Sequence, residues 1–273
     1  MEKNDILLRL FGHLLLISFL FTLSFCHSHA RRHEIIPPAS LNVDDIVTER
    51  NIPKQHRIFQ ARFLPQIQLA NNNILMERNL LHDIRDSLDD HGELSLFLNR
   101  QLNELLNKYG LEPVQPASPP PADSLFRHIE HLLRRVDIVP VKLVMAQAII
   151  ESGWGTSDFA REGNNYFGIR CYEDGCGLPP SGVDSVTFWV KAYPNEMAGI
   201  EDYLWTLNTH PAYHEFRQER ASMRDQKEAI DPLKLIHGLD QYSEKRDEYV
   251  SMVSNIIRNY IPENAVELLK GEG

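Results

Sequence analysis

The sequence predicts a mostly helical fold with a few strands, and three observations carry that prediction. Between residues 55 and 109, leucine and isoleucine side chains recur at helical spacing in two stripes. The segment 138–150 is apolar almost all round, which is typical of a helix buried in a core. The segment 186–193, Val-Thr-Phe-Trp-Val-Lys-Ala-Tyr, is rich in β-branched and aromatic residues and alternates in polarity, which indicates a strand.

The N-terminus predicts an export signal over residues 1–30. No charge occurs between Arg9 and Arg31, and residues 10–26 are nearly all apolar. Ser28 and Ala30 offer the small residues that a signal peptidase reads. An uncleaved membrane anchor and a lipoprotein signal through Cys26 remain as alternatives. We therefore expect an exported protein of the periplasm or cell envelope that has no membrane contact beyond this segment.

The rest of the chain divides at a proline-rich stretch. We expect an N-terminal helical region over residues 31–112, a linker over 113–122, a second domain over 123–263 and a tail over 264–273. The N-terminal helical region either positions a partner or substrate or only packs on the second domain, and we favour packing. Five prolines mark the boundary: Pro113, Pro116, Pro119, Pro120 and Pro121.

Charge and composition limit the classes of ligand. The chain has 28 Lys and Arg against 38 Asp and Glu, a net charge of −10, which argues against nucleic-acid binding. We find no glycine loop of the kind that holds phosphates, and we expect no cofactor. The composition indicates no particular protein partner.

The cysteines predict a disulfide and not a metal site. Without the signal segment, only Cys171 and Cys176 remain, and an even count in an exported protein favours a bridge between them. No histidine cluster lies beside them in the sequence. We also expect no metal at the two histidine pairs with helical spacing, which are His128 with His131 and His210 with His214.

The apolar segment 138–150 ends in a carboxylate. Lys142 is its only charge, Pro140 suits a helix start, and Gly153 suits a helix end. Glu151 therefore lies on the last turn of a core helix. Desolvation and the negative end of the helix dipole both raise the pKa of such a carboxyl group, which suits a general acid. The alternative is a surface glutamate that merely follows a core helix.

Two motifs together resemble a known family. The pattern A-Q-A-x-x-E-S-G-W-G-x-S over residues 146–157 is followed by N-N-x-F-G-I over residues 164–169. This combination resembles the glucosaminidase domain of glycoside hydrolase family 73, whose members cut the glycan strands of bacterial peptidoglycan. The resemblance covers roughly residues 137–261, and the run 207–217 extends it toward the Bax-like members.

The resemblance implies a fold and an activity. It implies that residues 123–263 form a lysozyme-like α+β catalytic domain, mostly α, with a small β-hairpin lobe and a cleft for peptidoglycan glycan strands. It implies hydrolysis of the β-1,4 bond between N-acetylglucosamine and N-acetylmuramic acid, with Glu151 as general acid. Tyr242 stands where the family carries a tyrosine that orients the acetamido group or a water, although an ordinary half-buried tyrosine is equally expected.

The remaining site candidates are less sharply defined. Glu173 is the candidate for a second carboxylate, although Glu173, Asp174 and Asp184 all suit solvated loop positions. Asn165 could bond a sugar amide or cap the turn before the strand. Four aromatic residues are candidates for stacking on sugar rings, with core packing as the alternative, which is strong for Phe167: Trp154, Tyr166, Phe167 and Tyr193.

Two other functions compete with the glucosaminidase. A lytic transglycosylase also uses a glutamate followed by serine on a buried helix, but the Gly-Trp-Gly run and the Asn-Asn-x-Phe-Gly motif favour the glucosaminidase. A non-catalytic envelope protein that binds glycan or a partner fits the acidic charge and the helical N-terminal region. An intact Glu151 within an intact motif argues against that alternative.

Overall fold

The structure, a computed structural model, describes residues 41–114, 121–180, 187–242 and 246–265. Every described residue belongs to one compact unit. The expected export signal and most of the proline-rich linker lie outside the described residues. Within the described ranges, no helix is long and apolar enough to cross a bilayer.

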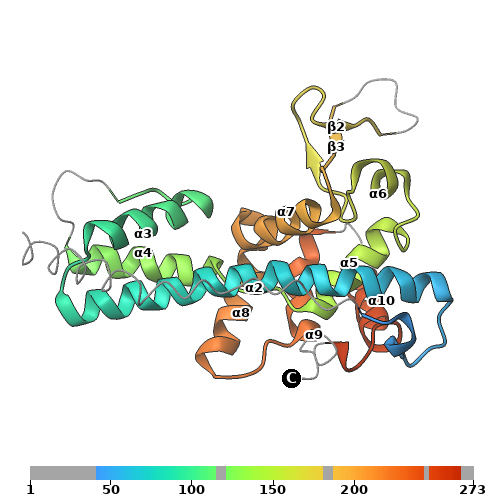
Figure 1. Ribbon diagram of the computed structural model, residues 1–273, viewed down its shortest axis with the longest axis horizontal. Coiled ribbons are helices and arrows are strands. Elements are labelled where there is room, and N and C mark those ends of the chain that lie inside the picture. The colour runs from blue at the N-terminus through green and yellow to red at the C-terminus, as the bar shows by residue number, and fades with distance from the viewer. Residues whose placement is uncertain (1–40, 115–120, 181–186, 243–245, 266–273) are drawn as a thin grey trace, which may run out of the picture. The chain divides into compact units, whose positions relative to one another are not determined.

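Helices dominate the described chain, and a small antiparallel sheet completes a mostly α, lysozyme-like α+β fold, as predicted (Figure 1). The α-helices are α2 (Lys54–His91), α3 (Leu96–Lys108), α4 (Ala122–Arg135), α5 (Val141–Ser152), α6 (Asp158–Gly163), α7 (Glu196–Thr209), α8 (His214–Asp225), α9 (Pro232–Leu235) and α10 (Arg246–Asn259). Three 3-10 helices join them: η1 (Val43–Asp45), η2 (Pro211–Tyr213) and η3 (Ile236–Tyr242).

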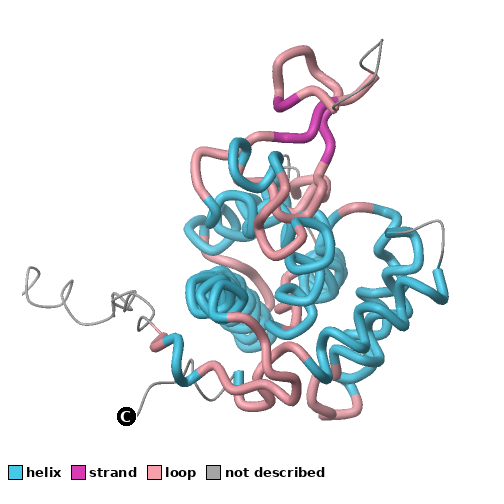
Figure 2. Tube along the Cα trace, turned by 90° about the vertical axis from the view of Figure 1, so that its right-hand side faces the viewer, coloured by secondary structure: helices cyan, strands magenta, loops and turns pink. Residues whose placement is uncertain are grey.

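The strands form one three-stranded sheet at one end of the helical body (Figure 2). β1 (Arg170–Cys171) and β2 (Gly177–Leu178) both pair antiparallel with β3 (Trp189–Lys191), in the order β1-β3-β2. The described strand β3 is shorter than the predicted 186–193, because beyond Lys191 the chain turns to α6, where the Tyr193 N–H donates to the Gly163 carbonyl at 2.8 Å. This sheet is the β lobe.

The N-terminal helical region shares its core with the rest of the described chain. Helix α2 packs against α3, α4, α5 and α7. Its side chains Phe63, Leu64 and Ile67 are fully buried and belong to the same hydrophobic cluster as those of α5. The packing expected of this region is therefore present, and α2 is a wall of the domain that carries Glu151.

A buried ionic cluster fixes the turn that leads into α5. The fully buried Arg220 of α8 donates to the carbonyl oxygens of Asp137 and Ile138 and to Asn208. Asp137 accepts two bonds from Arg224, at 3.0 and 2.8 Å. Burial alone would raise the pKa of Asp137, but these arginines hold it below its usual range. The cluster joins α4, α5 and α8 where α5 begins.

Candidate active site

Helix α5 places Glu151 on its last turn. The helix begins after Pro140 and ends at Gly153, whose φ of 56° is left-handed. The hydroxyl of Ser152 donates to the Ala148 carbonyl and accepts from the Gly155 N–H at 2.8 Å, so this serine fastens the helix end rather than the carboxylate. The predicted start and end of this helix are confirmed, and its one carboxylate leaves the core at the helix terminus.

Glu151 opens into a cavity of about 680 Å³. Its walls come from the end of α5, the chain from Phe167 to Tyr172, strand β3, helix α7 and η2. The lining residues are Glu151, Phe167, Gly168, Ile169, Arg170, Tyr172, Lys191, Asp202, Tyr203, Trp205, Thr206, His210 and Tyr213. The β lobe and the helices thus enclose one cleft, and the two motifs of the sequence meet in it.

The surroundings of Glu151 raise its pKa to about 7, through burial. The Glu151 side chain is exposed to the cleft, but protein surrounds its carboxyl group on the other sides. The carboxyl group therefore loses much of its hydration, which disfavours its charged form. Tyr213 and Tyr249 lie within reach of its charge: burial raises the pKa of both phenols, and ionised Glu151 raises it further. A Cβ on Gly168 would lie 3.7 Å from Glu151 Oε2, so the glycine of the second motif lies beside the carboxylate of the first.

A hydrogen-bonded layer lies beneath Glu151, one turn earlier on α5. The buried Gln147 side chain donates to the Tyr249 hydroxyl at 2.7 Å and accepts from the Tyr203 hydroxyl. Tyr203 in turn stacks on Phe167, with ring centroids 4.1 Å apart and planes 7° apart. This layer joins α5, α7, α10 and the loop after α6, and it fixes the floor of the cleft.

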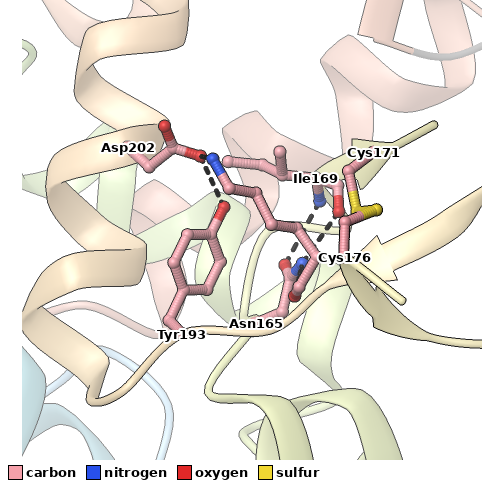
Figure 3. Close-up of a disulfide and its surroundings, with 7 residues drawn as sticks. Asn165, Ile169, Cys171, Cys176, Tyr193 and Asp202 are labelled. Atoms are coloured by element: carbon pink, nitrogen blue, oxygen red, sulfur yellow. Dashed lines mark hydrogen bonds and ion pairs between the residues drawn. A yellow bond between two sulfur atoms is a disulfide. The ribbon is translucent and has the colours of Figure 1, made fainter. Parts of the chain in front are cut away.

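Asn165 shapes the loop that faces Glu151. Its Oδ1 accepts from the N–H groups of Phe167 and Ile169, and its Nδ2 donates to the carbonyls of Ile169 and Lys191. Figure 3 shows Asn165 beside Ile169. The side chain is buried and is not among the residues that line the cavity. Of the two roles that the sequence left open, this geometry favours the turn-capping role, which ties the loop to β3.

Trp154 and Tyr166 are not among the residues that line the cleft, and their rings pack against α2, which favours the core-packing alternative for both. Trp154 stacks on His56 of α2, with centroids 3.9 Å apart and planes 3° apart. Tyr166 packs edge-on against Phe63 and donates its hydroxyl to Glu196 at 2.9 Å. In both cases the packing partner belongs to α2, a segment about a hundred residues earlier in the chain.

Tyr193 also lies behind the cavity wall, where it orients a carboxylate that faces the cleft. Its hydroxyl donates to Asp202 Oδ2 at 2.6 Å, and Lys191 Nζ lies 2.9 Å from the same oxygen (Figure 3). Asp202 lines the cavity, whereas Tyr193 does not. The sequence identified the supporting tyrosine and missed the carboxylate that it supports.

The other site residues predicted from the sequence either do not line the cavity or have side chains outside the described residues. Cys171 and Cys176 form the predicted disulfide, which closes the turn between β1 and β2. Glu173 is exposed within that turn and does not line the cavity. Tyr242 ends η3, and its side chain lies outside the described residues.

Several cleft residues come from α7 and η2, where no catalytic or binding residue was predicted from the sequence. A signal was present, because Asp202 and Thr206 lie four apart on α7, on a polar stripe beside its apolar face. Tyr213 lay inside the run 207–217 that carried part of the resemblance. Among the described residues no group of three or more His, Cys, Asp or Glu could hold a metal.

Comparisons with known proteins agree with this geometry. Residues 127–261 match the glucosaminidase family model, described as mannosyl-glycoprotein endo-beta-N-acetylglucosaminidase. The chain is 32% identical to "Protein bax" of Escherichia coli (strain K12) over 193 residues, which cover 71% of this chain and 65% of that protein. It is 42% identical to "Exo-glucosaminidase LytG" of Bacillus subtilis (strain 168) over 48 residues, which cover 18% of this chain and 17% of that protein.

No solved structure matches the chain significantly. The chain spans less than two thirds of the length of either relative. The family model begins on α4 and ends just after α10. Both sequence motifs and every described residue of the cleft fall inside it. The chain is therefore a Bax-like protein whose residues 127–261 belong to the glucosaminidase family.

Proposed function

We propose that the protein is an exported peptidoglycan hydrolase that cleaves the β-1,4 bond between N-acetylglucosamine and N-acetylmuramic acid, with Glu151 as general acid. The observation that carries the proposal is a single desolvated carboxyl group, with its pKa raised to about 7, inside a 680 Å³ cleft between helices and a β lobe. A carboxylic acid that keeps its proton near neutral pH can protonate the leaving oxygen of a glycosidic bond.

Besides the general acid, the reaction needs a second group that stabilises the developing positive charge, and this proposal has two sources for it. A 2-acetamido sugar supplies its own nucleophile in substrate-assisted hydrolysis, and the protein then needs only to support it. Tyr242 keeps its proposed role of orienting that group or a water. Asp202 supplies the other carboxylate among the described lining residues, and Tyr193 and Lys191 hold one of its oxygens.

The test is digestion of isolated peptidoglycan with the purified protein, followed by mass spectrometry of the released muropeptides. We expect new reducing-end N-acetylglucosamine with the wild type and at least a hundredfold less with Glu151→Gln. Glu162→Gln is the matched control, because Glu162 is an exposed glutamate on the last turn of α6. Glu173→Gln should also retain activity, since Glu173 lies outside the cleft.

The pH profile and the product ends separate this proposal from its rivals. The value of kcat/KM should fall as pH rises through about 7, because the general acid must be protonated. Anhydro-muramyl ends would assign the protein to the lytic transglycosylases. Binding of glycan without new ends, in both wild type and variant, would assign it a non-catalytic role. Full activity of Glu151→Gln would refute the role of this carboxylate.

A further inference from the structure

A second hollow lies beside the cleft, along the same helix α7. It has a volume of about 300 Å³ and is lined by Ala70, Asn73, Ile74, Lys108, Tyr109, Glu201, Asp202, Leu204, Trp205 and Asn208. Asp202 and Trp205 line both this hollow and the Glu151 cleft. The two spaces are therefore neighbours along α7. We call the second one the α7 hollow.

Half of the α7 hollow comes from outside the glucosaminidase family match. Asn73 and Ile74 belong to α2, and Lys108 ends α3, whereas the match begins at residue 127. The Trp205 indole joins the two parts, because its Nε1–H donates to the Lys108 carbonyl at 2.7 Å. The side chain is nevertheless 42% exposed, which leaves a flat apolar face at the junction of the two spaces. The N-terminal helical region thus builds a wall that the family domain alone lacks.

The chemistry of the α7 hollow suits a peptide. Its floor is apolar, since Ile74 and Leu204 are almost fully buried. Its rim offers hydrogen-bonding groups: among the described residues, neither the Asn73 amide nor the Glu201 carboxylate has a hydrogen-bond or ion-pair partner. Lys108, by contrast, is already paired with Glu77. Such a site accepts amide N–H groups, small aliphatic side chains and an ammonium group.

We propose that the α7 hollow binds the peptide stem of a peptidoglycan strand, with the ammonium group of the stem's diamino acid at Glu201. This inference rests on the proposed function for the reason that the strand reaches the hollow from the cleft. Muramyl sugars carry the stem on their lactyl group, so a strand held in the cleft projects a peptide from every second ring. The Asp202–Trp205 boundary, where the two spaces meet, is the exit for that peptide.

A titration tests the α7 hollow without any requirement for cleavage. The probe is a muramyl tripeptide that ends in a diamino acid, together with the same molecule acetylated on its side-chain amine, each titrated calorimetrically into the full-length protein. Glu201→Gln should weaken binding of the free-amine probe about fivefold, the upper range for a partly exposed ion pair, and leave the acetylated probe unchanged. Asn73→Ala should weaken binding of both probes, and Glu162→Gln of neither.

Strand digestion separates failure of this inference from failure of the proposed function. Glycan strands with intact stems are compared with strands stripped by an amidase. We expect Glu201→Gln to lower kcat/KM on stem-bearing strands alone. A wild type that cleaves neither substrate contradicts the proposed function, and the titration still decides the α7 hollow. Probe binding that is absent, or equal in wild type and Glu201→Gln, overturns the inference even if both substrates are cleaved.

Discussion

Ionised Glu151 should destabilise the folded protein at alkaline pH. The unfolding free energy of Glu151→Gln, compared with that of the wild type, should show this directly. The pKa of Glu151 is about 7 in the folded state, against an ordinary value of 4.5. Because the folded-state value is the higher one, the favourable contribution of the protonated form is complete below about pH 4.5. It is lost as pH rises through about 7. Glu151→Gln cannot ionise and escapes this loss.

The size of the effect follows from the difference between the two pKa values. At about 1.36 kcal/mol per pKa unit, the full difference corresponds to about 3.4 kcal/mol. The carboxyl group contacts water in the cleft, so solvent screening reduces this figure, and we expect about 1 kcal/mol. Relative to wild type, Glu151→Gln should therefore gain about 1 kcal/mol of unfolding free energy between pH 5 and pH 8.5.

The assay is urea denaturation of wild type and Glu151→Gln at several pH values. Only the difference between the two proteins is used, because other groups titrate in both. Glu162→Gln is the control for the loss of one exposed helix-terminal carboxylate. A wild type–variant difference that stays flat with pH, or that favours the wild type as pH rises, would refute the desolvation argument. A gain in stability joined to a loss of activity would be typical of a strained catalytic group.

The remaining predictions concern the loop and the β lobe that enclose the cleft. Asn165→Ala should cost about 3 kcal/mol of unfolding free energy, because it removes four hydrogen bonds between this side chain and backbone groups of the loop and β3. The exposed Asn72→Ala on α2 should cost less than about 0.5 kcal/mol in the same urea titration, and equal costs would contradict the capping role. Replacing Cys171 and Cys176 with serine should cost about 2 kcal/mol, measured against the oxidised wild type, and a cost near zero would show that the bridge adds no stability.

Much of the helical framework could be predicted because its signals are local. The end of α5 at Gly153 depends on residues within one turn of that end. The cap of α7 at Asn195, whose side chain accepts from the Ala198 N–H, is also local. The Cys171–Cys176 bridge joins residues five apart, so chain proximity favoured it without knowledge of the fold. The family motifs marked Glu151 as a candidate site residue because the two motifs are close in sequence, and in the structure their ends meet at one cleft.

The ligand faces could not be predicted in the same way, because they depend on distant segments. Trp154 between two glycines is typical of an exposed aromatic, yet His56 covers its ring. Asp202 on its own is one acidic residue of a helix, and it becomes a cleft carboxylate only when Tyr193 and Lys191 are folded against it. A residue's burial and partners are set by whatever packs on it, and the sequence around that residue does not contain this information.

By itself the sequence determined which residues end helices, which cysteines pair and which glutamate ends a buried helix, since each depends on neighbours a few positions away. Only the tertiary structure decided that α2 covers Trp154 and Tyr166, that α7 lines the cleft, and that α2 and α3 add a second hollow beside it. The physical reason is that hydrophobic burial is not directional. Many faces of α2 and α7 are apolar enough to pack, and the shared core selects the one arrangement that buries them together.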